Sequence, residues 1–197
     1  MPALSVSIDG VTVATTCTDG YEVVSVRAGG TRIDEDFATL DLSGGSYPEN
    51  GESIYLFWIN DLCLRAGQVV TVSFLEDAST SHPGKTIEEL FPDEPPITQT
   101  DFKPTAEMYK ELRSKPKLRE KYSFRLVTSS GASFIGETTP EEYGFGFTVL
   151  WNSHQPKRAR VALHSYTLDC LEARDPLNYH FEERIHYDSS VQFELVA

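Results

Sequence analysis

The chain has 197 residues, with 17 lysines and arginines against 30 aspartates and glutamates, so its formal net charge is -13 at neutral pH. Hydrophobic residues make up 40% of the chain and aromatic residues 11%, a composition that excludes disordered and fibrous proteins. An acidic surface repels nucleic acid and anionic membranes and attracts basic proteins. The composition therefore predicts a folded protein that binds neither nucleic acid nor membranes.

The negative charge is concentrated in the first half of the chain. Residues 1–100 contain four basic and 16 acidic residues, whereas residues 101–197 contain 13 basic and 14 acidic ones. Met1–Val6 lacks the basic and apolar stretches of a secretory signal, and no window reaches the roughly 18 apolar residues of a membrane span. The three cysteines are Cys17, Cys63 and Cys170. Their wide spacing favours free thiols over disulfides or zinc ligands, so we expect a cytoplasmic protein.

Short alternating segments dominate the first part of the chain. The strands predicted there are residues 4–8, 11–13, 21–27, 37–42, 54–59 and 69–75. Asp9 and Gly10 favour the tight turn of a β-hairpin because both tolerate positive φ angles. The aromatic run Ile54–Ile59 predicts a strand that is buried on both faces, and residues 69–75 are its expected partner.

The middle of the chain changes character. Residues 85–91 predict a short helix, since Thr86 and Glu89 have the spacing of a capping box. Prolines and acidic residues between 92 and 104 predict an exposed connector. Residues 105–113 predict a second short helix, which is amphipathic.

Strands return in the second half of the chain. They are predicted at residues 122–128, 133–135, 145–151, 158–168, 180–187 and 191–196. Residues 145–151 alternate most regularly, as is typical of a strand with one buried face. The expected hairpin turns are Ser129–Gly131 and Asp188–Ser190, and Thr139–Glu142 predicts a helix start or a turn.

The pattern predicts a mainly β protein, an antiparallel β-sandwich with one or two short helices in the middle. Three regions are expected: an acidic β-rich half at 1–91, a connector with a short helix at 92–121, and a second β-rich half at 122–197. These regions can pack as one domain. Trp58 and Trp151 lie 93 positions apart in similar surroundings. Two similar halves and a chance likeness of two hairpins are both open interpretations.

Sequence motifs for catalysis and phosphate binding are missing. Gly84–Thr86 ends like a phosphate-binding loop, but Ser79 stands where that motif needs its first glycine. No HExxH, CxxC or GxSxG spacing occurs. We therefore predict no catalytic residue and no cofactor. Aromatic residues such as Tyr55 and Phe57 are expected in the core and not on a ligand platform.

The last part of the chain contains the best metal candidate. If residues 180–187 are extended, then His180, Glu182, Arg184 and His186 share one face. Two histidines and a carboxylate are typical zinc ligands. The arginine between them opposes a second positive charge, so we predict no metal site.

Trp58–Leu62, followed by Leu64–Val72, resembles a strand-turn-strand signature of small acidic bacterial proteins of unassigned role. Some of these proteins look like immunity partners of interbacterial toxins. Gln68 departs from the signature, which more usually has an acidic residue after the glycine. The resemblance implies a protein that caps a basic, nucleic-acid-degrading enzyme, and it transfers no functional residue to this chain.

Charge and resemblance lead to one hypothesis, a non-enzymatic protein that binds a basic protein partner as an inhibitor or immunity protein. The expected contact residues are Asp34, Glu35, Asp36, Glu88, Glu89, Asp93 and Glu94. Solvated loop charge is the alternative interpretation of these residues. A small-molecule or carbohydrate-binding β-sandwich and a structural subunit of a larger assembly are the other functions left open.

Overall fold

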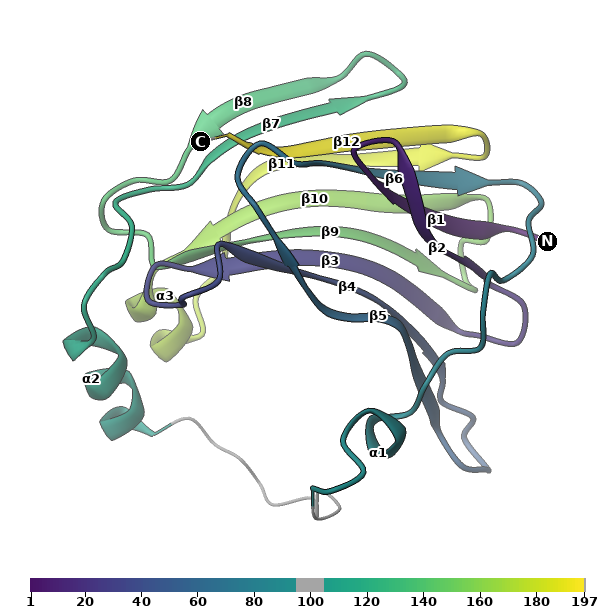
Figure 1. The fold of residues 1–197 in the computed structure, drawn as a ribbon, viewed down its shortest axis with the longest axis horizontal. Coiled ribbons are helices and arrows are strands. Elements are labelled where there is room, and N and C mark those ends of the chain that lie inside the picture. Colours follow the sequence, from purple (N-terminus) through teal and green to yellow (C-terminus); the bar gives the residue numbers. More distant parts are fainter. Residues whose placement is uncertain (95–104, 197) are drawn as a thin grey trace.

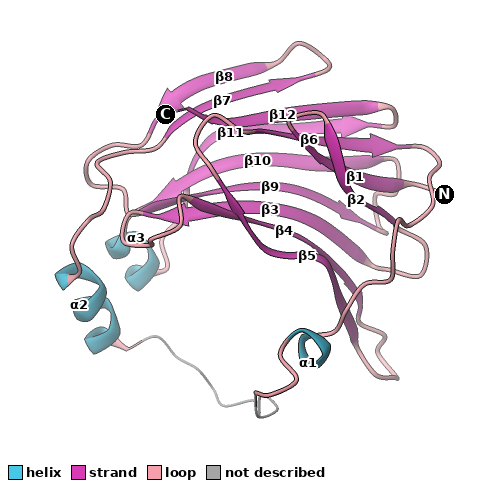
Figure 2. Cartoon of the chain, in the orientation of Figure 1, coloured by secondary structure: helices cyan, strands magenta, loops and turns pink. Residues whose placement is uncertain are grey.

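The computed structural model describes residues 1–94 and 105–196. Two six-stranded antiparallel sheets pack face to face (Figures 1 and 2), which confirms the predicted mainly β sandwich. Sheet A has the order β2 (Val11–Cys17), β1 (Ala3–Ile8), β6 (Val69–Leu75), β12 (Ser189–Val196), β7 (Ser123–Thr128) and β8 (Ser133–Glu137). Sheet B has the order β11 (Asn178–His186), β10 (Arg158–Tyr166), β9 (Gly144–Asn152), β3 (Val23–Thr31), β4 (Ala38–Ser46) and β5 (Ile54–Leu64). Residues 95–104 of the expected connector lie outside the described residues.

The two halves of the chain have the same strand topology. In sheet A, β2-β1-β6 of the first half is followed by β12-β7-β8 of the second, and in sheet B, β11-β10-β9 is followed by β3-β4-β5. Each half therefore contributes three strands to each sheet, and the halves meet where β6 pairs with β12 and β3 pairs with β9. Trp58 and Trp151 are not equivalent positions of the two halves, as their similar sequence surroundings had suggested. Trp58 lies in β5, which corresponds in this strand order to β11, whereas Trp151 lies in β9.

Both halves contribute to one apolar core between the sheets. Its largest fully buried apolar side chains are Tyr122, Phe74, Phe124, Phe145, Phe147 and Phe193. Phe147 of β9 stacks on Phe193 of β12, with ring centroids 4.5 Å apart and planes 2° apart. A pair of this kind joins the two sheets and adds about 0.5–1.5 kcal/mol beyond the area that it buries.

The first predicted hairpin is confirmed, because β1 and β2 pair across Asp9 and Gly10, whose φ angles are 52° and 82°. Two other pairings were wrong. β5 and its expected partner β6 lie in different sheets, and so do β11 and β12. The run Ile54–Ile59 is not buried on both faces, since Ile54 is 52% exposed and Tyr55 and Phe57 are only half-buried. Alternation identifies the faces of a strand, but it does not identify the neighbouring strand.

Three short helices lie on the outer side of sheet B, which arches over them in Figure 1. They are α1 (Ile87–Leu90), α2 (Ala106–Ser114) and α3 (Leu168–Ala173). The first two were predicted, and the Thr86 capping box is present. α3 was missed, because the strand predicted at 158–168 ends at Tyr166 and Thr167 caps a helix instead, accepting the Cys170 N–H at 3.0 Å. No helix among the described residues has the length and apolar character to cross a membrane.

Candidate functional site

The outer side of sheet B carries three adjoining hollows along β4 and β5. The central hollow, of about 420 Å³, lies over Tyr55 and Phe57. A second, of about 440 Å³, shares both residues with it and reaches Glu88 of α1. A third, of about 350 Å³, shares Asp61 with the central hollow and reaches Asp34–Asp36. Because neighbouring hollows share lining residues, we describe them together as the β5 groove. Its charged and aromatic lining residues are Arg27, Asp34, Glu35, Asp36, Asp41, Tyr55, Phe57, Asp61, Glu88 and Phe91.

The β5 groove brings together four of the seven acidic residues predicted as contacts. Asp34–Asp36 are exposed and line one end, and Glu88 is exposed and lines the other. Glu89 is exposed, but its carboxylate accepts a backbone N–H of the α1 capping box at 2.9 Å. Asp93 and Glu94 are exposed and line none of the three hollows. The predicted contact surface is therefore divided between the groove and its surroundings.

Two arginines hold the acidic turn Asp34–Asp36 in place. Arg119 donates to the carbonyls of Thr31 at 2.6 Å and Glu35 at 3.3 Å, and its guanidinium lies 5.6 Å from the centre of the Phe37 ring. Arg32 is only 2% exposed and donates to two carbonyls of the β8–β9 loop at 2.5 and 2.8 Å. These arginines bind backbone oxygens, so they fix the turn while its acidic side chains stay exposed.

The lining of the β5 groove is strongly acidic, with six carboxylates and one guanidinium, that of Arg27. Burial raises the pKa of Asp41, and the negative charge of Asp61 adds to this effect. The hydrogen bond from the Asp61 N–H and the positive charge of Arg27 lower the pKa, but it stays above its usual value. Arg27 lies directly opposite Asp41 in the β3–β4 pairing. Walls of one sign in a partly enclosed groove concentrate the field and attract cations.

Aromatic residues add apolar surface to the same groove. Tyr55 and Phe57 are half-buried on the outer face of β5, so their expected place in the core was wrong. Phe91, at the end of α1, is 41% exposed and lines the central hollow. The sequence held one usable signal, because polar residues such as Asp41 and Ser43 alternate in β4 with buried leucines, which marks an outward polar face.

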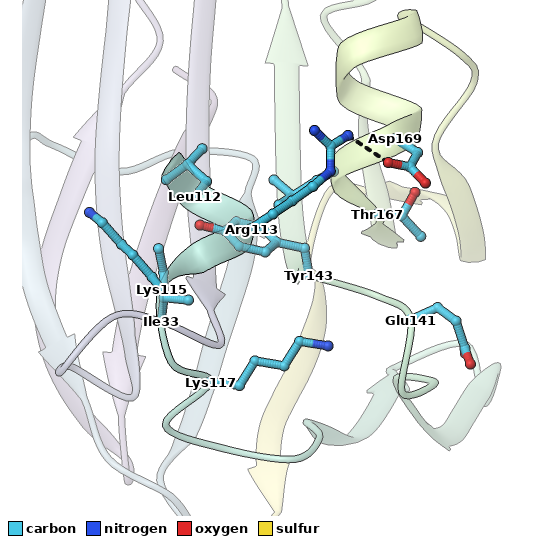
Figure 3. Close-up of a pocket in the computed structure, with 10 residues that line it drawn as sticks. Ile33, Leu112, Arg113, Lys115, Lys117, Glu141, Tyr143, Thr167 and Asp169 are labelled. Atoms are coloured by element: carbon cyan, nitrogen blue, oxygen red, sulfur yellow. Dashed lines mark hydrogen bonds and ion pairs between the residues drawn. The ribbon is translucent and has the colours of Figure 1, made fainter. Parts of the chain in front are cut away.

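A separate cavity of about 280 Å³ lies between α2, α3 and the β3–β4 loop (Figure 3). Its apolar walls are Ile33, Leu112, Tyr143 and Leu168. At the rim, Arg113 pairs with Asp169 at 2.6 Å and with Glu172 at 2.5 Å, so its positive charge is already more than balanced by two carboxylates. Lys117 donates to a backbone carbonyl at 3.1 Å, and Lys115 points away from Tyr143 in Figure 3. This cavity therefore suits a small, largely apolar group.

A buried polar cluster joins the β8–β9 loop to sheet B. The Glu142 carboxylate accepts hydrogen bonds from the Ser165 hydroxyl, from Asn178 Nδ2 at 2.9 Å and from the Thr139 N–H at 2.7 Å. Burial raises the pKa of this carboxyl, but the hydrogen bonds outweigh burial and hold the pKa below its usual value. The Ser165 hydroxyl also lies 2.6 Å from His180 Nε2. A nucleophilic serine needs the histidine between itself and the acid, whereas here the serine is central and fully buried, so the cluster is structural.

The predicted metal-ligand face of β11 is interrupted by an irregularity in its pairing with β10, between Leu163 and His164. His180 stacks with a phenylalanine of β8 on the inner side, whereas Glu182 pairs with Arg160 at 2.6 Å. The prediction that His180 and Glu182 share one face of the strand was therefore wrong. Within residues 1–94 and 105–196, no three histidines, cysteines or carboxylates gather as metal ligands would.

Comparisons with protein-family models, with curated proteins and with solved structures find no match to this chain. The class of the protein is therefore defined by its own architecture, an antiparallel two-sheet sandwich whose halves have the same strand order. The lining of the β5 groove is more acidic than that of the cavity between α2 and α3.

Proposed function

We propose that this protein is a non-enzymatic binding protein whose β5 groove holds a basic segment of another protein. The observation that carries the proposal is that six carboxylates and three aromatic rings line one groove. Carboxylates pair with lysine and arginine, and aromatic rings attract the same cationic groups. Inhibition of, or immunity to, a basic enzyme is the role that the charge and the resemblance at Trp58–Leu62 support.

The shape of the groove supports an extended segment as the occupant. Its three hollows adjoin one another along neighbouring strands, from the turn Asp34–Asp36 to α1. Two backbone hydrogen bonds between Phe57 and Lys85, of 2.8 and 2.9 Å, attach the segment before α1 to β5. Both ends of the groove are therefore anchored to sheet B, and the groove needs little rearrangement to bind.

Binding of a synthetic peptide of about ten residues that alternates arginine with serine tests the proposal. We expect saturable binding whose association rate falls steeply as salt rises from about 0.01 M to about 0.15 M, because the Debye length shrinks from about 30 Å to about 8 Å. The double variant Glu35→Gln, Asp36→Asn should weaken binding about three- to tenfold. Stopped-flow fluorescence of a labelled peptide measures both effects.

The double variant Asp93→Asn, Glu94→Gln is the matched control, since it removes the same charge from exposed residues outside the groove lining. It should change the affinity less than twofold. Equal losses for the two double variants would mean that net charge alone attracts the peptide, and the groove would then have no special role. The proposal is also contradicted if a glutamate-serine peptide binds equally well.

A second candidate function, binding of a small molecule, is supported by the cavity between α2 and α3 (Figure 3). Its volume of about 280 Å³ is slightly below the range of about 300–1,000 Å³ that is typical of ligand pockets. The rim arginine is already paired, so the cavity has fewer free polar groups to select a ligand than the β5 groove has. We therefore favour the groove.

A further inference from the structure

We propose that the central hollow of the β5 groove binds one arginine side chain and that this arginine anchors the basic partner. The inference rests on the proposed function and names the chemical group that the groove recognises. Two carboxylates, three aromatic rings and Arg27 surround the hollow. The carboxylates and the rings can each contact a guanidinium, whereas Arg27 opposes its charge and limits the hollow to a single cation.

The aromatic rings form a corner of the hollow. The ring centroids of Tyr55 and Phe57 are 5.2 Å apart and their planes are inclined by 78°. The Tyr55 hydroxyl lies 2.8 Å from the Ser43 hydroxyl, which fixes the ring on β4. Phe91 approaches from α1 and stays 41% exposed. Aromatic faces around a hollow attract a cation through the ring quadrupole.

The carboxylates supply the acceptors. The Asp61 N–H donates to Asp41 Oδ1 at 2.8 Å, so the two aspartates are neighbours in the same hollow. Asp61 has a φ of 49° at an irregularity in the β4–β5 pairing, and such bulges redirect a side chain out of the regular strand pattern. Arg27 offsets one of the two charges when both aspartates are ionised. One net negative charge is left for a monovalent cation.

Arginine fits this lining better than other cationic groups do. A guanidinium is planar, donates several N–H bonds in fixed directions to carboxylates, and stacks on aromatic faces. A lysine ammonium acts as a point charge without a flat face. A quaternary ammonium has no N–H donor, so the oxygens of Asp41 and Asp61 would lose hydrogen bonds to water and gain none.

The second half of the chain holds an arginine of its own in comparable surroundings. The Arg160 guanidinium lies 5.3 Å from the centre of the Tyr179 ring and 2.6 Å from a Glu182 oxygen. These residues belong to β10 and β11, which correspond in strand order to β4 and β5. An aromatic ring and a carboxylate on the corresponding strands therefore already hold a guanidinium in this protein.

The test uses the whole chain and N-acetyl-arginine N-methylamide as the probe, with the citrulline analogue as its neutral counterpart. In a ¹H–¹⁵N NMR titration we expect saturable shifts of β5 amides with the arginine probe and none with citrulline. Phe91→Ala should weaken binding about two- to fivefold. Asp61→Asn should weaken it about fivefold, and asparagine tolerates the positive φ of this position.

Tyr179→Ala is the matched control, because Tyr179 is exposed to a similar degree, 47%, and lies outside the β5 groove. It should leave binding of the probe unchanged. Equal binding of citrulline, or tighter binding of a trimethyl-lysine probe, would overturn the assignment to arginine. If the arginine-serine peptide binds but Phe91→Ala and Asp61→Asn have no effect on it, the anchor is wrong and the proposed function stands. If no basic peptide binds, both fail.

Discussion

Single buried polar residues determine how firmly the β8–β9 loop is attached to sheet B. Arg32 and Glu142 are 2% and 4% exposed, and both bind within the loop segment at Thr138–Glu142. Each would be costly to bury without partners. Arg32 meets carbonyl oxygens, whereas Glu142 meets hydroxyl, amide and backbone donors. The loop therefore depends on complementary pairing of two buried charges with neutral groups.

Glu142→Gln should lower the free energy of unfolding at neutral pH by about 1–3 kcal/mol, since the amide places an NH₂ group among donors that need an acceptor. The folded protein holds the pKa of Glu142 below its unfolded value. The contribution of Glu142 is therefore fully present above the unfolded pKa and is lost as the pH falls through the folded pKa. Urea unfolding at neutral pH and at successively lower pH below the unfolded pKa should show the difference in stability between wild type and variant shrinking in acid.

The neighbouring exposed residue provides a control for this prediction. Glu141→Gln removes the same charge one position earlier, where the side chain is exposed, and should change stability by less than about 0.5 kcal/mol. A loss of equal size in both variants would point to general electrostatics and not to the buried hydrogen bonds. A gap that persists in acid would contradict the pKa argument.

At the scale of helices and strands, the sequence predicted the local structure of each segment better than it predicted which strands pair with each other. The alternation in β9 and the capping box at Thr86 depend on neighbouring residues, and both were recovered. The pairing of β6 with β12 joins segments more than a hundred residues apart, and no local pattern encodes it. Of the residues that line the candidate site, the sequence had singled out only those at its acidic ends, Asp34–Asp36 and Glu88. Its centre was missed because aromatic residues of an edge strand look like core residues in the sequence.

The attachment of α1 to β5 determines where Glu88 and Phe91 lie in the β5 groove. A Cβ at Gly84 would lie 2.9 Å from Leu56 Cβ and 2.9 Å from Trp58 Cε2. Gly84→Ala must therefore push the segment before α1 away from β5, and Glu88 and Phe91 would move with it. We expect about two- to fivefold weaker binding of the arginine-serine peptide, with a stability loss of about 1–3 kcal/mol.

Pro83→Ala, at the preceding exposed position, is the control for this change and should leave peptide binding as it is. Binding measured at a temperature where both variants are fully folded separates displacement of α1 from unfolding. Unchanged affinity in folded Gly84→Ala would show that α1 contributes nothing to the groove.

At the scale of the whole molecule, the two halves of the chain differ in charge but have the same strand order. This shared strand order explains how both halves build one core. Each half supplies three strands to each sheet and leaves two strand edges, those of β3 and β6 or of β9 and β12, for the other half. Both central pairings are antiparallel. The halves are therefore joined about an approximate twofold axis, as two copies of one unit would be.

This arrangement predicts that neither half is stable as a monomer. Residues 1–94 expressed alone would expose the edges of β3 and β6 and half of the core, and exposed edges pair with other chains. We expect this fragment to dimerise or aggregate in size-exclusion chromatography with light scattering, and to form a 1:1 complex when refolded with residues 105–197. Circular dichroism should show one unfolding transition for the intact chain, because the halves share one core. A folded monomer of residues 1–94, or two separate transitions of the intact chain, would contradict the shared core.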